Sequence, residues 1–175
     1  MTPWGQARPV RVGPWGQTLP RSPGSRGHGR DYNRAVSRIY TLRDADAIVP
    51  EIEAVVQRLR HLRDDVVALR NAQLLREAAL AGADAARGDA LDSDPEILRL
   101  RLRTRGLVDQ MQADAAWLDE RDIVLRDIST GLLDFPAEAR GEPIWLCWRL
   151  GESSVTAWHG RDEGFGGRRP IGELG

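Results

Sequence analysis

The sequence predicts an α+β fold, in which a long, coiled-coil-like antiparallel helical hairpin precedes a small antiparallel β-sheet of about four short strands. Apolar residues recur every three or four positions over 52–69 and again over 97–118. From residue 123 onward the apolar period changes to two. A chain of 175 residues is long enough for one domain with a modest core, which is expected over 37–175 (hairpin 37–120, β-rich block 121–175).

The first helix is expected to begin near Thr41, whose side chain can cap it. Pro50 removes one backbone donor, so we expect the helix to kink or restart there. Beyond Pro50 the apolar positions form a narrow heptad seam. Its members are Ile52, Val55, Leu59, Leu62, Val66 and Leu69.

The second helix is expected after a loop over 82–92, with Ser93 or Asp94 as its cap. Pro95 follows in the first turn, where a missing N–H does no harm. Two amphipathic helices joined by a loop fold back on each other, so the two seams should pack together. The second seam consists of Ile97, Leu100, Leu107, Met111, Ala115 and Leu118, with Thr104 filling the gap.

The four expected strands are separated by short connections. The segment 129–131 is a turn in which Gly131 suits a positive φ, 139–143 is a loop and 151–154 is a second turn. The last stretch, 160–175, is rich in glycine and expected to be irregular. The strands themselves are 123–128, 132–136, 144–150 and 155–159.

Alternation assigns the residues of the third strand to two faces. One face is entirely apolar and is expected to meet the core; it holds Ile144, Leu146, Trp148 and Leu150. The opposite face carries Trp145, Cys147 and Arg149.

Composition excludes several classes of protein. The formal net charge of −1 argues against a dedicated nucleic-acid or membrane-surface binder, because phosphate affinity needs excess positive charge. The single cysteine cannot close an intramolecular disulfide, which fits a reducing cytoplasm. No apolar run is long enough to span a bilayer or to form a secretory signal. We therefore expect a cytoplasmic protein that does not bind membranes.

Residues 1–36 are expected to form a disordered tail rich in Gly, Pro and Arg. One interpretation is a basic arm that touches nucleic acid or acidic partners. The alternative is that the native chain starts downstream, near Val36.

Several segments carry a family resemblance. "RIYTLRDADAIVPEI", "LRDISTGLLDFPA", "IWLCWRLGE" and "AWHGRDEGFGGRRPI" resemble the uncharacterised bacterial domain-of-unknown-function 2203 family over about residues 38–171. That family tends to place a glycine between the helix and the first strand, where this chain has "LDERD". The resemblance supports the fold and implies no activity.

The β-rich block concentrates the candidate metal ligands. His159 and Asp162 could converge on one divalent ion from a turn, with Asp134 or Glu152 as a base. The spacing matches no established ligand signature and names no cofactor. Asp134 also has a structural interpretation, a cross-strand ion pair with Arg126.

Other polar and aromatic candidates surround these ligands. Cys147 is interpreted either as a packing residue or as a thiol activated by His159. Trp145 and Trp158 suit either a core or an aromatic platform for single-stranded nucleic acid. Arg168 lies in "GFGGRRP", which suits either phosphate binding or an irregular terminal segment.

Two functions of different classes follow from these patterns. The first is a non-enzymatic interaction module whose hairpin forms a homodimer or docks a partner helix. The alternative is a metal- or small-ligand-binding protein, with metal-assisted hydrolysis as the chemistry of its C-terminal block.

Overall fold

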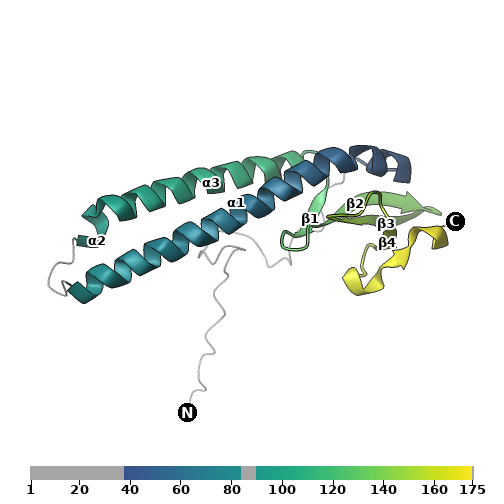
Figure 1. Ribbon diagram of the computed structural model, residues 1–175. Coiled ribbons are helices and arrows are strands. Elements are labelled where there is room, and N and C mark those ends of the chain that lie inside the picture. Colours follow the sequence, from purple (N-terminus) through teal and green to yellow (C-terminus); the bar gives the residue numbers. More distant parts are fainter. Residues whose placement is uncertain (1–37, 84–89, 175) are drawn as a thin grey trace, which may run out of the picture. The chain divides into compact units, whose positions relative to one another are not determined.

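The computed structural model describes residues 38–83 and 90–174 and has the predicted α+β fold (Figure 1). The predictions for residues 1–36 lie outside these residues. The helices are α1 (Leu42–Ala83), α2 (Ala90–Ser93) and α3 (Pro95–Asp119). The strands are β1 (Val124–Asp127), β2 (Leu132–Ala139), β3 (Glu142–Arg149), β4 (Ala157–Gly160) and β5 (Arg169–Pro170), with two 3-10 turns at Phe165–Gly167 and Ile171–Glu173.

The first helix begins with a reciprocal cap. The backbone N–H of Asp44 donates to Thr41 Oγ1 at 3.1 Å, and the Thr41 N–H donates to Asp44 Oδ2 at 3.3 Å. The predicted restart at Pro50 is wrong, because α1 continues through it as one helix. The helix keeps its other backbone hydrogen bonds and its buried face, which offset the single donor that proline removes.

The two predicted seams pack against each other in an antiparallel hairpin (Figure 1). Asp94 caps α3, accepting from the N–H groups of Glu96 and Ile97. Arg58 clamps the middle of the hairpin through two bonds to Asp114, at 2.6 and 2.8 Å. Most seam residues are buried: Ile52, Val55, Leu59, Leu62, Val66, Ile97, Leu100, Met111 and Leu118.

Some details of the hairpin differ from the prediction. Ala115 is exposed, and Leu69 and Leu107 are half-buried. The described ends of the predicted 82–92 loop are helical, since α1 runs to Ala83 and α2 adds a turn before α3; residues 84–89 lie outside the description. A glycine near a helix end tolerates helical geometry, so Gly82 did not end α1.

The sheet has five antiparallel strands in the order β1-β2-β3-β4-β5, one more than predicted. The 139–143 loop is shorter than predicted, because β2 and β3 extend to a two-residue turn at Arg140 (φ +55°) and Gly141 (φ +80°). The C-terminal stretch is not wholly irregular, because β5 pairs with β4 through Ala157–Pro170 and Trp158–Arg169.

The apolar face of the sheet packs against the first half of α1 (Figure 1). As predicted, Ile144, Leu146 and Trp148 lie in this core, together with Leu133 and Phe135. Hydrogen bonds join the residues before α1 to β2, and α1 to the residues before β4. Tyr40 N–H donates to Pro136 O at 2.8 Å, and Val155 N–H donates to Asp46 Oδ1 at 2.7 Å.

Two residues with left-handed backbone lie on either side of β1. Gly131 has φ +66°, as predicted, and its Cα faces Leu150 and Val56 so closely that a Cβ would overlap both. Asp122 has φ +56° and stands between helix and first strand, where the resembling family tends to have glycine. Its carboxylate accepts from the Arg38 N–H at 3.0 Å.

Within residues 38–83 and 90–174, no helix combines the length and the apolar composition that crossing a membrane requires.

Candidate metal centre

The sheet face opposite the helices carries a buried polar cluster. In an antiparallel sheet, directly paired residues point to the same face. Asp134 pairs with Cys147, and Trp145 pairs with His159 on the next strand. Because Trp145 and Cys147 are two positions apart on β3, all four side chains lie on one face.

Three of these side chains converge. The ligand atoms of Asp134, Cys147 and His159 all lie within 4.8 Å of one another. These residues are buried, with exposed fractions of 2%, 1% and 4%. A carboxylate oxygen, a thiol sulfur and an imidazole nitrogen at this spacing form a set that a divalent transition metal accepts.

His159 is held in the orientation that metal-binding histidines adopt. Its Nδ1 lies 2.7 Å from the carbonyl oxygen of Gly160, which only accepts, so Nδ1 carries a hydrogen. Its Nε2 lies 3.2 Å from Asp134 Oδ2. A second hydrogen on Nε2 would donate to this carboxylate; without it, Nε2 offers a lone pair to a metal.

The Asp134 carboxylate is compensated by charge. Arg126 Nε donates to Asp134 Oδ2 at 2.6 Å, so the same oxygen faces both the guanidinium and the imidazole. The sequence predicted this ion pair, but the structure forms it differently: a bulge at Arg126 shifts the register, and Val124, not Arg126, lies opposite Asp134. The pair offsets the cost of burying the carboxylate.

Cys147 is a buried thiol. Its Sγ donates to the Trp145 carbonyl oxygen at 4.0 Å. Burial, and then the charge of Asp134, raise the pKa of the thiol far above its ordinary value, and Arg168 opposes the shift only in part. The thiol therefore keeps its proton at neutral pH, which argues against the nucleophile that sequence analysis considered.

The other candidate residues are placed outside this triad. Glu152 accepts from the Arg149 N–H at 2.9 Å and from Arg168 at 3.3 Å, which closes the turn after β3. Asp162 is exposed in the turn after β4. Neither residue belongs to the group of converging ligands found among the described residues. Trp158 lies on the opposite face, beneath the guanidinium of Arg169.

All three triad residues were candidates from the sequence, but only Asp134 and His159 were assigned to one metal site. Cys147 was interpreted as a packing residue or a nucleophile and not as a metal ligand, because the strand registers were open. The two-residue turn at 140–141 sets the β2–β3 register that joins Cys147 to Asp134. Gly141 suits this turn, but Arg140 does not favour its positive φ, so the sequence signal is weak.

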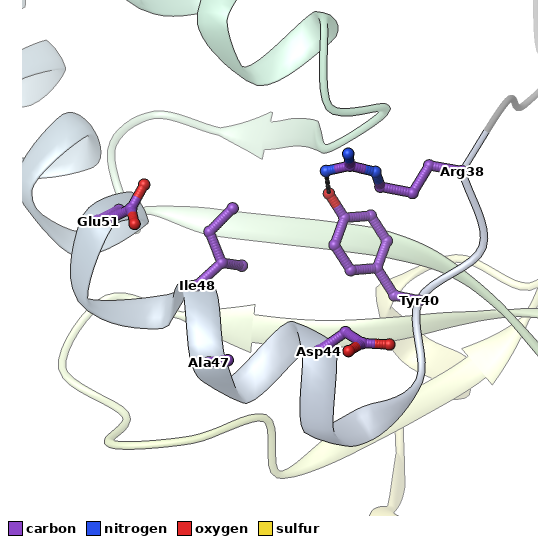
Figure 2. A pocket seen from close by; sticks show the side chains of 6 residues that line it. All are labelled: Arg38, Tyr40, Asp44, Ala47, Ile48 and Glu51. Atoms are coloured by element: carbon purple, nitrogen blue, oxygen red, sulfur yellow. Dashed lines mark hydrogen bonds between the residues drawn. The ribbon is translucent and has the colours of Figure 1, made fainter.

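A separate hollow of about 350 Å³ lies beside the first turns of α1 (Figure 2). Three of its polar side chains already have partners: Arg38 donates to the Tyr40 hydroxyl at 3.4 Å, the hydroxyl donates to Arg121 O at 2.8 Å, and Asp44 takes part in the helix cap. The hollow therefore presents little unused chemistry. It is lined by Arg38, Tyr40, Asp44, Ala47, Ile48 and Glu51.

Comparison with known proteins identifies the family. A family model, described as an uncharacterized conserved protein (DUF2203), matches residues 38–171. No curated protein and no solved structure matches the chain. The matched range spans both helices of the hairpin and all five strands of the sheet, including the polar cluster. The chain belongs to the DUF2203 family.

Proposed function

We propose that this protein binds a divalent transition-metal ion of the zinc class through Asp134, Cys147 and His159. The observation that carries the proposal is the convergence of their ligand atoms within 4.8 Å in a buried cluster. The orientation of His159 supports it, because Nδ1 is held by a backbone carbonyl and Nε2 points to the other ligands.

The donor set selects the class of metal. One nitrogen, one oxygen and one sulfur suit zinc, cobalt or similar borderline ions, whereas calcium and magnesium require oxygen ligands. Three protein ligands leave one tetrahedral position for water or another ligand. A hydrolytic role lacks support, because the predicted base Glu152 bonds Arg168 and Asp162 is exposed. The proposal is therefore limited to binding.

Charge and proton balance follow from the same residues. Metal binding would replace the thiol proton of Cys147, so that one thiolate and the Asp134 carboxylate neutralise a doubly charged ion. The neighbouring cation Arg126 opposes metal binding, because it repels the ion and occupies Asp134 Oδ2. Its side chain is 25% exposed, so its guanidinium can turn toward solvent when the metal takes Asp134 Oδ2. The requirement for a reduced thiol favours a cytoplasmic location.

Metal analysis of the full chain tests the proposal. After incubation with zinc and desalting, the wild type should retain about one ion per chain and unfold at a higher temperature than in chelator. The Cys147→Ser and Asp134→Asn variants should lose both effects. Glu152→Gln and Asp162→Asn are the matched controls, and they should keep both. The proposal would be contradicted if the Cys147→Ser variant retained zinc, or if the wild type retained none.

The hairpin supports a second candidate function, an interaction module that pairs with a second copy of the chain. The seams are already buried against each other, so a partner must use the outer faces of the helices. The described outer faces expose large apolar side chains, led by Leu75 (74%) and Leu102 (72%), with Leu74 and Leu98 beside them.

Charge favours a second copy as the partner. The exposed leucines of α3 alternate with arginines, of which Arg103 and Arg105 make no ion pair within residues 38–83 and 90–174. On α1, Asp64 and Asp65 are exposed just before the apolar stripe. A coiled-coil contact between copies would bring Arg103 and Arg105 of one hairpin near Asp64 and Asp65 of the other.

Light scattering after size exclusion tests this second function. The wild type should be a dimer, and Leu75→Gln with Leu102→Gln should be monomeric. Ala54→Gln, an exposed α1 position beside the sheet, is the matched control and should remain dimeric. A wild type that stays monomeric at high concentration would contradict self-association.

A further inference from the structure

The indole of Trp145 is a buried donor that the metal proposal does not use. Trp145 is 4% exposed, and its Nε1 has no hydrogen-bond partner among the described residues. Leaving a buried donor unpaired costs about 1–3 kcal/mol, so native proteins rarely do so without a reason. Trp145 pairs with His159 across β3 and β4 and therefore lies beside the triad.

Two guanidinium groups converge on the same indole ring. The Cζ of Arg126 lies 4.9 Å from the ring centroid and that of Arg161 lies 5.3 Å from it. Two positive charges near one ring repel each other, and an anion close to both would offset that repulsion. Asp134 balances only Arg126.

Arg161 is left with its charge uncompensated by nearby contacts. It makes no hydrogen bond or ion pair within the described part of the chain beyond its contact with the ring. Its neighbour Asp162 is exposed and forms no ion pair with it, and Glu163 is committed to Arg169 and to the Gly160 N–H. Arg161 is half-buried, so its side chain can move to admit a small ligand.

We infer that Arg161, Arg126 and the Trp145 N–H bind a small oxyanion, either a carboxylate or a phosphate, beside the triad. Guanidinium groups match the two oxygens of such an anion, and an indole N–H adds a third donor. The anion supplies the negative charge that Arg161 lacks, and it gives the buried indole a partner. This site uses residues distinct from the three metal ligands, and Arg126 is the one residue that contacts both sites, through Asp134. Anion binding can therefore be tested in metal-free protein.

Calorimetric titration of the full chain with inorganic phosphate, and in a second arm with acetate, tests the inference at constant ionic strength. Binding by at least one anion is expected, and the stronger arm distinguishes the two classes of ligand. Arg161→Ala and Trp145→Phe should each weaken that binding tenfold or more. Arg149→Ala is the matched control, because it removes an arginine from the face of β3 that carries Trp145. This variant should change the affinity for the anion less than twofold.

A spectroscopic readout guards against loss of fold in the tryptophan variant. The Trp145 indole N–H signal, assigned by its absence in Trp145→Phe, should shift in the wild type on addition of the binding anion and stay fixed in Arg161→Ala. Failure of both anions to bind or to shift this signal, or equal binding by Arg161→Ala, would overturn the inference. The Cys147→Ser variant should keep anion binding while losing zinc, and this result separates the two proposals. A folded Cys147→Ser variant that no longer binds the anion would also overturn the inference.

Discussion

Replacing Gly131 by alanine probes the contact that joins the first hairpin to α1. Gly131 has φ +66°, a conformation that costs an L-residue about 1–2 kcal/mol. An added Cβ would lie 2.6 Å from Leu150 Cβ and 2.9 Å from Val56 Cγ1, both on firmly packed neighbours. Overpacking of this kind costs a further 1–3 kcal/mol or so, and Gly131→Ala should therefore lower the free energy of unfolding by about 2–5 kcal/mol.

Gly141 supplies the matched control. It also has a positive φ, +80°, but an added Cβ would meet no atom within 4 Å. Gly141→Ala should therefore show the backbone cost alone, about 1–2 kcal/mol. Gly106 lies in the exposed middle of α3, and an added Cβ there would also meet no atom within 4 Å. Gly106→Ala should therefore raise the free energy of unfolding, by about 0.5–1 kcal/mol, because alanine is the better helix former.

Urea denaturation of the three variants and the wild type measures these differences in the free energy of unfolding. The dependence of that free energy on urea concentration should be the same in all four proteins. The gap between Gly131→Ala and Gly141→Ala is the free energy attributable to the contact with Leu150 and Val56. Equal losses in the two variants would refute the close approach of the turn to α1. The proposed docking of the sheet on the first half of that helix would then need revision.

Two further predictions concern ionisable residues. Because the pKa of Cys147 is raised in the folded chain, the thiol ionises first in the unfolded chain. The free energy of unfolding in chelator should then fall above about pH 8.5, by up to about 1.4 kcal/mol per pH unit. Cys147→Ala should lack this component in parallel urea titrations at about pH 8 and pH 10, and identical slopes would refute the burial of the thiol. Asp122→Gly should lie within about 1 kcal/mol of the wild type, because relief of the φ +56° conformation offsets the lost bond to Arg38 N–H. Asp122→Ala loses the bond and keeps the strain, so it should be less stable than Asp122→Gly by about 1–2 kcal/mol in thermal unfolding, and the reverse order would refute this account.

Periodicity was sufficient to predict the hairpin and most of the sheet. The heptad spacing from Ile52 to Val66 placed these residues on one buried face, because a helix returns to the same face every three or four positions. Alternation on β3 likewise separated Ile144 and Leu146 from Cys147. The positive φ of Gly131 and the Asp94 cap were predictable because each depends on the local backbone: the turn needs a positive φ, and the first N–H groups of the helix need an acceptor.

The errors arose where tertiary contacts outweigh local preference. Pro50 was expected to kink or restart α1, yet α1 is one continuous helix through it, with buried residues on both sides. Arg140 has no strong preference for a positive φ, so the tight turn it forms with Gly141 was predicted as a longer loop. The two-residue strand β5 is too short to leave a periodic signal.

The candidate site was predictable residue by residue but not as a group. Its members come from three strands, and their convergence depends on two registers that residue types leave open. The bulge at Arg126 shows the difficulty: the ion pair with Asp134 forms although the pairing that predicted it does not.

The absorption spectrum of the cobalt-substituted protein tests the metal centre most directly. A cobalt ion held by Cys147 sulfur, His159 nitrogen and Asp134 oxygen should give a thiolate-to-cobalt charge-transfer band and the intense visible bands of a tetrahedral site. The charge-transfer band should vanish in Cys147→Ser and persist in Glu152→Gln. A wild-type spectrum indistinguishable from that of aqueous cobalt would contradict the proposed metal centre.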